Sequence, residues 1–108
     1  MKEKFTPGPW EKQYARRRDE WGIYPKGEIV IIASVMPNVP EYDANAALIA
    51  AAPELYEALM PFAALARVFE SRGYAGNVRV MSFDNREVQI NASDCYNARA
   101  ALAKAQVE

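Results

Sequence analysis

Residues 44–66 read ANAALIAAAPELYEALMPFAALA and contain ten alanines and no glycine. Alanine has the highest helix propensity, and the whole interval between Glu28 and Arg72 lacks glycine, so the sequence predicts a long helix here. Asp43 is the expected N-cap, because its carboxylate can accept a backbone N–H of the first turn. Arg72-Gly73 is the expected end, with Gly73 in the left-handed conformation that commonly follows a helix.

Two prolines interrupt this helix, and one side of it is apolar. Pro53 and Pro61 each lack a backbone N–H, so we expect a kinked helix or two to three consecutive segments. Apolar residues recur at helical spacing, and such a stripe needs a covering surface. Its members are Leu48, Ala52, Leu55, Leu59, Phe62, Ala66 and Phe69.

The segment before the helix predicts two to three antiparallel strands. Thr6-Pro7-Gly8-Pro9 is an expected turn that leads into a first strand, Trp10–Tyr14, where large apolar and polar residues alternate. The charged run Arg16–Glu20 is interpreted as a solvated loop, and Pro25-Lys26-Gly27 as a second turn. Glu28–Met36 is rich in Ile and Val, which predicts a strand buried on both faces or nearly so.

The last third of the chain predicts a short hairpin and a final helix. Asn77–Phe83 and Glu87–Ile90 are the expected strands, joined at Asp84-Asn85-Arg86. Ser93 or Asn91 can cap a helix that runs to about Gln106 and carries on one side Cys95, Tyr96, Arg99 and Leu102.

These elements together predict a single α+β domain over residues 1–108. An N-terminal antiparallel β-meander packs on the long proline-kinked helix, and a C-terminal helix and the short second hairpin follow.

The composition argues against several classes of function. Thirteen Lys and Arg against fourteen Asp and Glu leave a formal charge of -1, which does not suit a basic nucleic-acid coat. Histidine is absent, so there can be no Ser–His or Cys–His catalytic pair and no His-ligated metal. A lone cysteine can form neither an intrachain disulfide nor a thiolate-rich zinc site. We therefore expect a protein that is not an enzyme and has no catalytic residue, metal or cofactor.

Two motifs, Thr6-Pro7-Gly8-Pro9-Trp10 and Asn45–Leu55, resemble a widespread set of small phage and prophage proteins. In that set the first motif opens a short β-meander, and the second, Asn-Ala-x-Leu-Ile-Ala-Ala-Ala-Pro-(Asp/Glu)-Leu, lies in the helix that follows. A second alanine-rich helix often ends these proteins, and Ala98–Ala105 fits it loosely. The resemblance implies a viral or prophage origin and a fold, but no biochemical activity.

The first residues are charged, and no apolar signal region follows them. The most apolar run, Ile29–Met36, is far shorter than the roughly 20 residues that a membrane-spanning helix needs. We expect no membrane association and a cytoplasmic location, which is the host cytoplasm if the protein is encoded by a phage.

One basic segment lies among aromatic residues and is the candidate contact site. Such a segment can hold phosphates while the rings stack on bases. Because Asp19 and Glu20 follow it at once, a solvated loop or a protein-contact surface is the favoured interpretation. The candidate ligand or partner contacts are Arg16, Arg17, Arg18, Trp21 and Tyr24.

Two other features are interpreted as having a structural role rather than a functional one. Glu54 and Glu57 lie three residues apart on the helix, as in some acid–base or metal sites, but without further ligands they are expected to be solvated carboxylates. Cys95 is expected to be a small buried hydrophobe rather than a nucleophile.

A second side of the long helix carries small residues at Ala46, Ala50 and Ala51, next to Ile49 and Tyr56. Small residues let two helices approach closely, so this side can be covered by the C-terminal helix or by the matching helix of a second copy. The expected function is therefore a phage accessory protein that acts by binding, as a homo-oligomer such as a homodimer, with a host protein as a further partner. The alternative is an anti-defence protein that sequesters a nucleotide in a basic, aromatic groove of a dimer.

Overall fold

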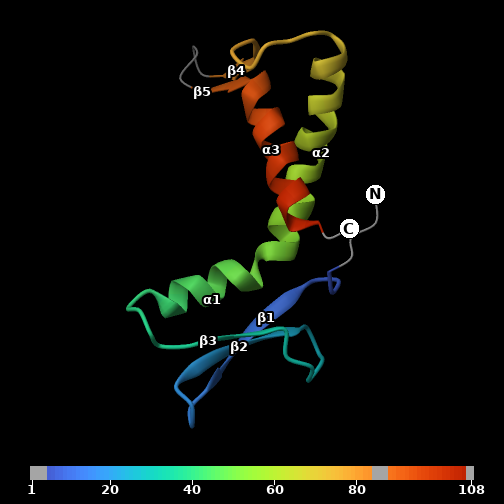
Figure 1. The fold of residues 1–108 in the computed structure, drawn as a ribbon. Coiled ribbons are helices and arrows are strands. Elements are labelled where there is room, and N and C mark those ends of the chain that lie inside the picture. Colours follow the sequence, from blue (N-terminus) through green and yellow to red (C-terminus); the bar gives the residue numbers. More distant parts are fainter. Residues whose placement is uncertain (1–4, 84–87, 107–108) are drawn as a thin grey trace. The chain divides into compact units, whose positions relative to one another are not determined.

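The computed structural model describes residues 5–83 and 88–106. The chain divides into two compact units, Met1–Glu57 (unit 1) and Ala58–Glu108 (unit 2). Figure 1 labels the helices and strands of both. Strands and helices occur in separate stretches of each unit, so the predicted α+β class is confirmed.

Unit 1 contains a three-stranded antiparallel sheet with the order β1-β2-β3. Its strands are β1 (Trp10–Ala15), β2 (Glu20–Pro25) and β3 (Ala33–Val35). The first helix, α1 (Tyr42–Ala50), lies over one face of this sheet and contacts all three strands (Figure 1). Ile23, Val35 and Ala46 form the buried centre between sheet and helix.

The strand predicted over Glu28–Met36 is wrong in length and burial. Of the predicted strand, only Ala33–Val35 (β3) pairs with β2. Before it, Ile29 is 94% exposed, Val30 67% and Ile31 49%. The turn at Gly27, where φ is 81°, sends the chain out of the sheet, and the chain rejoins it where the N–H of Ile32 donates to the carbonyl of Ile23 at 2.7 Å. Ile and Val content alone does not place a segment in a sheet, because strand pairing also needs a neighbour in register.

The predicted loop Arg16–Glu20 ends one residue early, since Glu20 opens β2. This central strand, EWGIYP, carries a glycine and a proline and no regular alternation, so the sequence analysis did not identify it as a separate strand. Its burial comes from the neighbours β1 and β3, with which it pairs on both edges.

The long helix is divided into α1 and α2 (Ala52–Ser71), as the two prolines predict, but only one of them divides it. Pro53 is the second residue of α2, and its missing N–H cannot bond to the carbonyl of Ile49. Pro61 lies inside α2 without ending it. Asp43 is not the N-cap: α1 begins at Tyr42 with Glu41 in that position and no side-chain cap bond.

Within the described residues, no single helix is long and apolar enough to cross a membrane. The pair α1 and α2 reaches the required length and composition only when joined across a bend of 54°.

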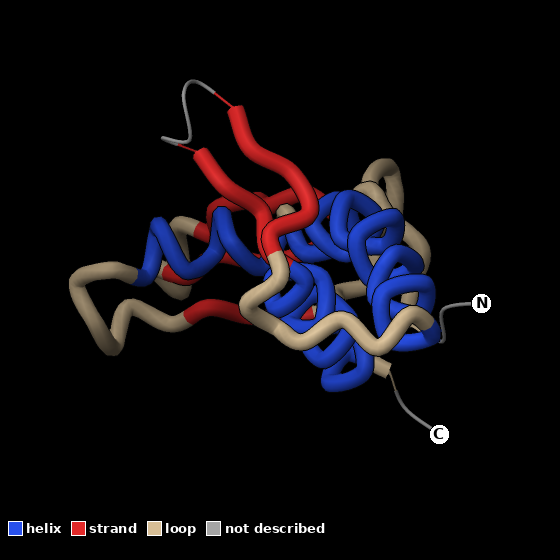
Figure 2. Tube along the Cα trace, turned by 90° about the horizontal axis from the view of Figure 1, so that it is seen from above, coloured by secondary structure: helices blue, strands red, loops and turns tan. Residues whose placement is uncertain are grey.

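Unit 2 contains most of α2, a two-stranded sheet and the last helix. Strands β4 (Arg79–Phe83) and β5 (Val88–Asn91) pair antiparallel, and Figure 2 shows them side by side. This pairing confirms the predicted hairpin, while its turn at Asp84-Asn85-Arg86 lies outside the described residues. Gly73, at φ 71°, ends α2, and the N–H of Tyr74 bonds to the carbonyl of Phe69 at 2.9 Å.

The last helix, α3 (Ala92–Ala105), begins with a capping box. The N–H of Asn91 donates to the carboxylate of Asp94 at 2.8 Å, so Asn91 rather than Ser93 is the N-cap. The Arg99 guanidinium donates to the Glu70 carboxylate, which joins α3 to α2 in unit 2. The buried side of α3 consists of Ala92, Cys95, Ala98 and Leu102.

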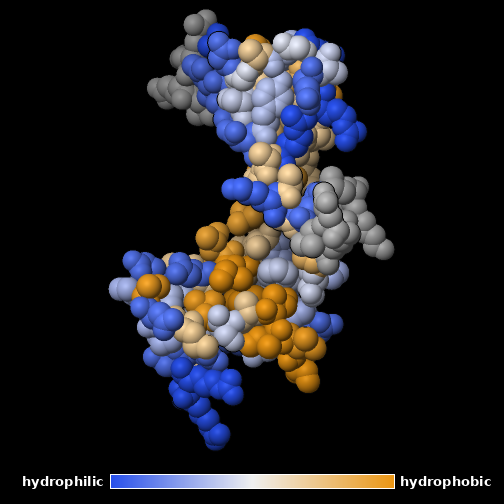
Figure 3. All heavy atoms as spheres, viewed as in Figure 1, coloured by the Kyte–Doolittle hydropathy of each residue, from blue (hydrophilic) through white to orange (hydrophobic). Residues whose placement is uncertain are grey.

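The apolar stripe predicted along the long helix is only partly covered. Ala66 is fully buried, whereas Leu48, Leu55 and Phe62 remain exposed. Unit 1 also exposes apolar surface, and Figure 3 shows hydrophobic side chains in orange gathered on the side in view.

Candidate functional site

The two motifs that carry the phage resemblance lie against each other in unit 1. A Cβ at Gly8 would stand 2.5 Å from the Cβ of Pro53, so only glycine lets the N-terminal turn approach the start of α2 this closely. The indole N–H of Trp10 donates to the carbonyl of Thr6 at 3.0 Å, and the rings of Phe5 and Tyr56 meet edge to face at 4.9 Å. The motifs are therefore two sides of one packing contact.

This contact leaves a pocket of about 420 Å³ at the surface of unit 1. Its walls are apolar rings, and two exposed carboxylates belong to its lining. The lining residues are Phe5, Pro7, Gly8, Pro9, Pro53, Glu54 and Glu57. Glu54 and Glu57 thus lie at a pocket, but within the described part of the chain no further metal-ligating side chain joins them.

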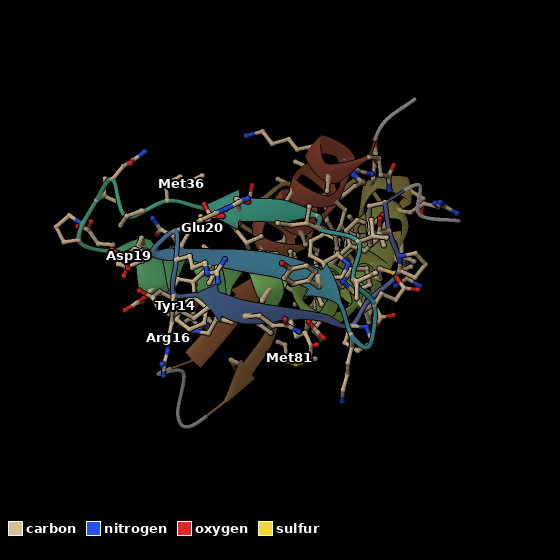
Figure 4. All side chains as sticks on the ribbon, turned by 90° about the horizontal axis from the view of Figure 1, so that it is seen from below. Tyr14, Arg16, Asp19, Glu20, Met36 and Met81 are labelled. Atoms are coloured by element: carbon tan, nitrogen blue, oxygen red, sulfur yellow. The ribbon has the colours of Figure 1, made fainter. Side chains whose placement is uncertain are left out.

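The predicted arginine run forms the turn between β1 and β2. Arg16, Arg17 and Arg18 are all exposed, and Arg18 lies 3.6 Å from the buried carboxylate of Glu20. Figure 4 shows Arg16 near Tyr14 and Asp19 at this end of the hairpin. The solvated location agrees with the favoured interpretation of the run.

Trp21 and Tyr24 are not brought together within one chain. Successive side chains in a strand point to opposite faces, and residues three apart therefore lie on opposite sides. Trp21 packs with Ile23 against the core, whereas the ring of Tyr24 lies across Gly22, where a Cβ would stand 2.7 Å from a ring carbon. The five candidate residues form no common surface in the single chain.

A polar and aromatic cluster that the sequence analysis did not identify lies beside the arginine turn. The hydroxyls of Tyr14 and Tyr42 both donate to the carboxylate of Asp19, the latter at 3.2 Å. The indole N–H of Trp21 donates to the carboxylate of Asp43, which lies in the first turn of α1. These partners are separated by up to 23 residues, so no local spacing reveals them.

The cluster ties the hairpin turn to the start of α1. The hydrogen bond to Asp19 raises the pKa of Tyr14 to about 12, and burial followed by Asp19 raises the pKa of Tyr42. Both phenols are therefore neutral donors at physiological pH and cannot act as bases. Asp19 itself adopts a left-handed φ of 50°, which Asp tolerates better than most residues. These hydrogen bonds hold the β1–β2 turn against the start of α1, and we call the arrangement the clamp around Asp19.

Unit 2 contains a second depression, called here the α2–hairpin groove, of about 370 Å³. Its surface is mostly apolar, and two exposed arginines, Arg72 and Arg79, belong to its lining. The other lining residues are Phe62, Leu65, Phe69, Tyr74, Val78, Val80, Met81, Ile90 and Cys95.

Cys95 is fully buried, and burial together with the nearby Asp94 raises the pKa of its thiol. A protonated, enclosed thiol is a poor nucleophile. Across residues 5–83 and 88–106, no group of three or more His, Cys, Asp or Glu side chains could hold a metal ion.

The chain was compared with known proteins and families. No curated protein and no solved structure matches it. One family does match, over residues 1–108, and its description is Salmonella phage P22 protein Y8K6. Because the match spans the whole sequence, this chain belongs to that phage protein family.

Proposed function

We propose that this phage protein is a non-enzymatic accessory protein that acts as a homo-oligomer and binds a second protein, encoded by the host, through segment 28–32, of which residues 28–31 are exposed. The observation that carries this proposal is the exposure of Ile29, Val30 and Ile31 beside the sheet edge β3. A contiguous apolar patch of this kind is characteristic of protein-binding surfaces.

The backbone of the same segment is open as well. Residues 29–31 make no backbone hydrogen bond to any residue in the described ranges. An extended segment with free N–H and C=O groups can accept a strand from a partner, while its apolar side chains supply the buried area. Residues 29–31 thus combine an open backbone with exposed apolar side chains, the two features that strand addition uses.

The proposal is tested by purifying the tagged protein from host cells and weighing the intact complex by native mass spectrometry. The variant Ile29→Lys with Ile31→Lys places two charges in the contact. Val39→Lys is the matched control, because Val39 is also an exposed apolar residue of unit 1 but lies outside the segment. We expect one host protein in fixed ratio with the wild type and with the control, and at least a tenfold loss with the double variant. Equal retention by all three proteins would refute binding through this segment.

One observation favours nucleotide binding as a second candidate. Arg16 and Arg17 are exposed and pair with no carboxylate among the described residues. Against it, Lys12 already lies 4.4 Å from the centre of the Trp21 ring, and the indole N–H of Trp21 is bonded to Asp43. A nucleotide that binds the folded protein raises the melting temperature by mass action, whereas an unchanged melting temperature across a nucleotide panel would exclude this candidate.

A further inference from the structure

We infer that the α2–hairpin groove of unit 2 binds a peptide segment of another protein, and that this segment is apolar with carboxylates at one end. Every residue that lines the groove belongs to unit 2, so the surface is complete within one compact unit. Segment 28–32 belongs to unit 1, so this inference goes beyond the proposed function and does not depend on it.

The first argument is the exposed apolar surface of the groove. Phe62, Leu65 and Phe69 contribute to it from α2, where their spacing of three and four residues places them on one helical face. Phe62 is 41% exposed and Leu65 40%. Met81 contributes from β4 and is 48% exposed. Large apolar side chains that stay this exposed together mark a surface that a partner covers.

The second argument is charge. Arg72 and Arg79 line the groove, both are exposed, and neither takes part in an ion pair among the described residues. The backbone N–H of Arg72 donates to the carbonyl of Val68 at 3.2 Å, so Arg72 continues the helical face although α2 ends at Ser71. A purely apolar occupant would leave both guanidinium groups without a partner, whereas carboxylates on the occupant would pair with them.

The third argument is the order of the lining residues along the helix. From Phe62 to Arg72 the chain rises about 15 Å at 1.5 Å per residue, with the apolar side chains first and the guanidinium group last. A peptide covers this length with about ten residues as a helix or about five in an extended conformation. The occupant is therefore a short apolar stretch whose Asp or Glu residues lie at the end that reaches Arg72.

The exposure and the ring contacts of the groove favour a peptide over other ligands. A small-molecule site encloses most of its ligand, whereas Phe62, Leu65 and Met81 are each at least 40% exposed. A single-stranded nucleic acid needs free ring faces on which its bases stack, but Phe69 is already stacked on Tyr74 with the ring centroids 5.7 Å apart. Aromatic residues, Met and Arg, which are enriched at interfaces between proteins, all line this groove.

The test begins with a displayed library of random peptides about twelve residues long, which is enough to span the groove in either conformation. The library is first depleted on the variant Arg72→Glu with Arg79→Glu and then selected on the wild type, so that only peptides that depend on these arginines are recovered. We expect the recovered peptides to combine apolar residues with Asp or Glu. Recovery of no peptide, or of peptides without carboxylates, would overturn the inference.

Fluorescence anisotropy then measures the dissociation constants of the recovered peptides. The variant R72E/R79E should raise the constant at least tenfold. Leu65→Ser removes an exposed apolar side chain without a change of charge and should raise it at least threefold. The matched control is Arg67→Glu with Lys104→Glu, which makes the same total charge change at exposed positions of unit 2 that do not line the groove, and it should stay within about twofold of the wild type. An equal loss in this control would reveal a general charge attraction and overturn the inference.

Two further measurements separate other occupants and the proposed function. Displacement of the recovered peptides by a single-stranded deoxythymidine oligomer would assign the groove to nucleic acid and overturn the inference. Ile29→Lys with Ile31→Lys should leave the peptides bound, so failure of host-protein binding at segment 28–32 does not affect this result. Loss of the peptides in that variant would place their site in unit 1 and overturn the inference. Circular dichroism of each variant verifies that the substitutions leave the fold intact.

Discussion

At the scale of single residues, Gly8 lies where the N-terminal turn approaches the start of α2 closely. Its hydrogen occupies the place where any other residue would bring a Cβ to within 2.5 Å of the Cβ of Pro53. The glycine is thus explained by a close approach of two chain segments that are distant in sequence.

Gly8→Ala should destabilise the protein by about 1–3 kcal/mol, because the added methyl overpacks this contact. The measurement is the midpoint of thermal or urea unfolding. The same substitution in a Pro53→Gly background is the control and should cost clearly less, since the opposing Cβ is then gone. An equal cost in both backgrounds would contradict the assignment of the clash to Pro53.

Tyr14 should ionise late in an alkaline titration. Its carboxylate partner Asp19 raises the pKa of the phenol from 10.0 to about 12. Because the folded pKa is above the unfolded one, the stabilisation from this bond is complete below about pH 10 and is lost as the pH rises through about 12. Phenolate absorbance should show at least one of the six tyrosines ionising near pH 12. Asp19→Asn should move that ionisation towards pH 10, and an unchanged titration would exclude the bond.

At the scale of elements, the turn between β1 and β2 has three arginines that take part in no core contact. Replacing Arg16, Arg17 and Arg18 together by Ala should change the free energy of unfolding by no more than about 0.5 kcal/mol. Urea denaturation measures this directly. Arg18 is the member most able to affect stability, because its ion-pair partner Glu20 is buried. A larger loss in the triple variant than in Arg16→Ala with Arg17→Ala would come from this pair.

The start of α3 depends on its capping box. Asp94→Ala removes the carboxylate that accepts the N–H of Asn91 and a negative charge from the first helical turn, and should cost about 1 kcal/mol. Asn97→Ala is the control, because Asn97 is an exposed residue of the same helix outside the cap. Thermal unfolding followed at 222 nm should show the larger shift for Asp94→Ala; equal shifts would mean that the cap contributes no specific stability.

Local signals were sufficient for some elements and not for others. The alanine-rich helix and its stop at Gly73 follow from propensity and capping, which act over a few residues. The N-cap of α3 was narrowed to Ser93 or Asn91, and the structure selects Asn91. The strand β2 was missed because its stability comes from pairing on two edges. The excess length expected for β3 has the same origin, since the Ile and Val residues before it have no strand-pairing partner among residues 5–83 and 88–106.

At the scale of the whole molecule, the proposed homo-oligomer predicts a sedimentation coefficient that rises with protein concentration, because association follows mass action. Sedimentation velocity over a range of concentrations measures this directly. A protein that stays monomeric at all of them would contradict the homo-oligomer.

Only part of the candidate site could be predicted from the sequence. The arginine run and its exposure were anticipated, and so was the burial of Cys95. The clamp around Asp19, the pocket between the two motifs and the α2–hairpin groove were not, because their members come from segments that meet only in the folded chain.

The sequence by itself determined the class of fold, the helical stretches and the lack of histidine-dependent chemistry, since composition and local propensity act without tertiary context. It also indicated the phage relationship through two motifs, although their role as opposite sides of one contact emerged only from the structure. The tertiary structure decided which apolar segments are buried and which stay exposed. Burial depends on which neighbouring elements the fold places against a segment. Ile29–Ile31 and one face of α2 stay exposed although both have the apolar composition of a core.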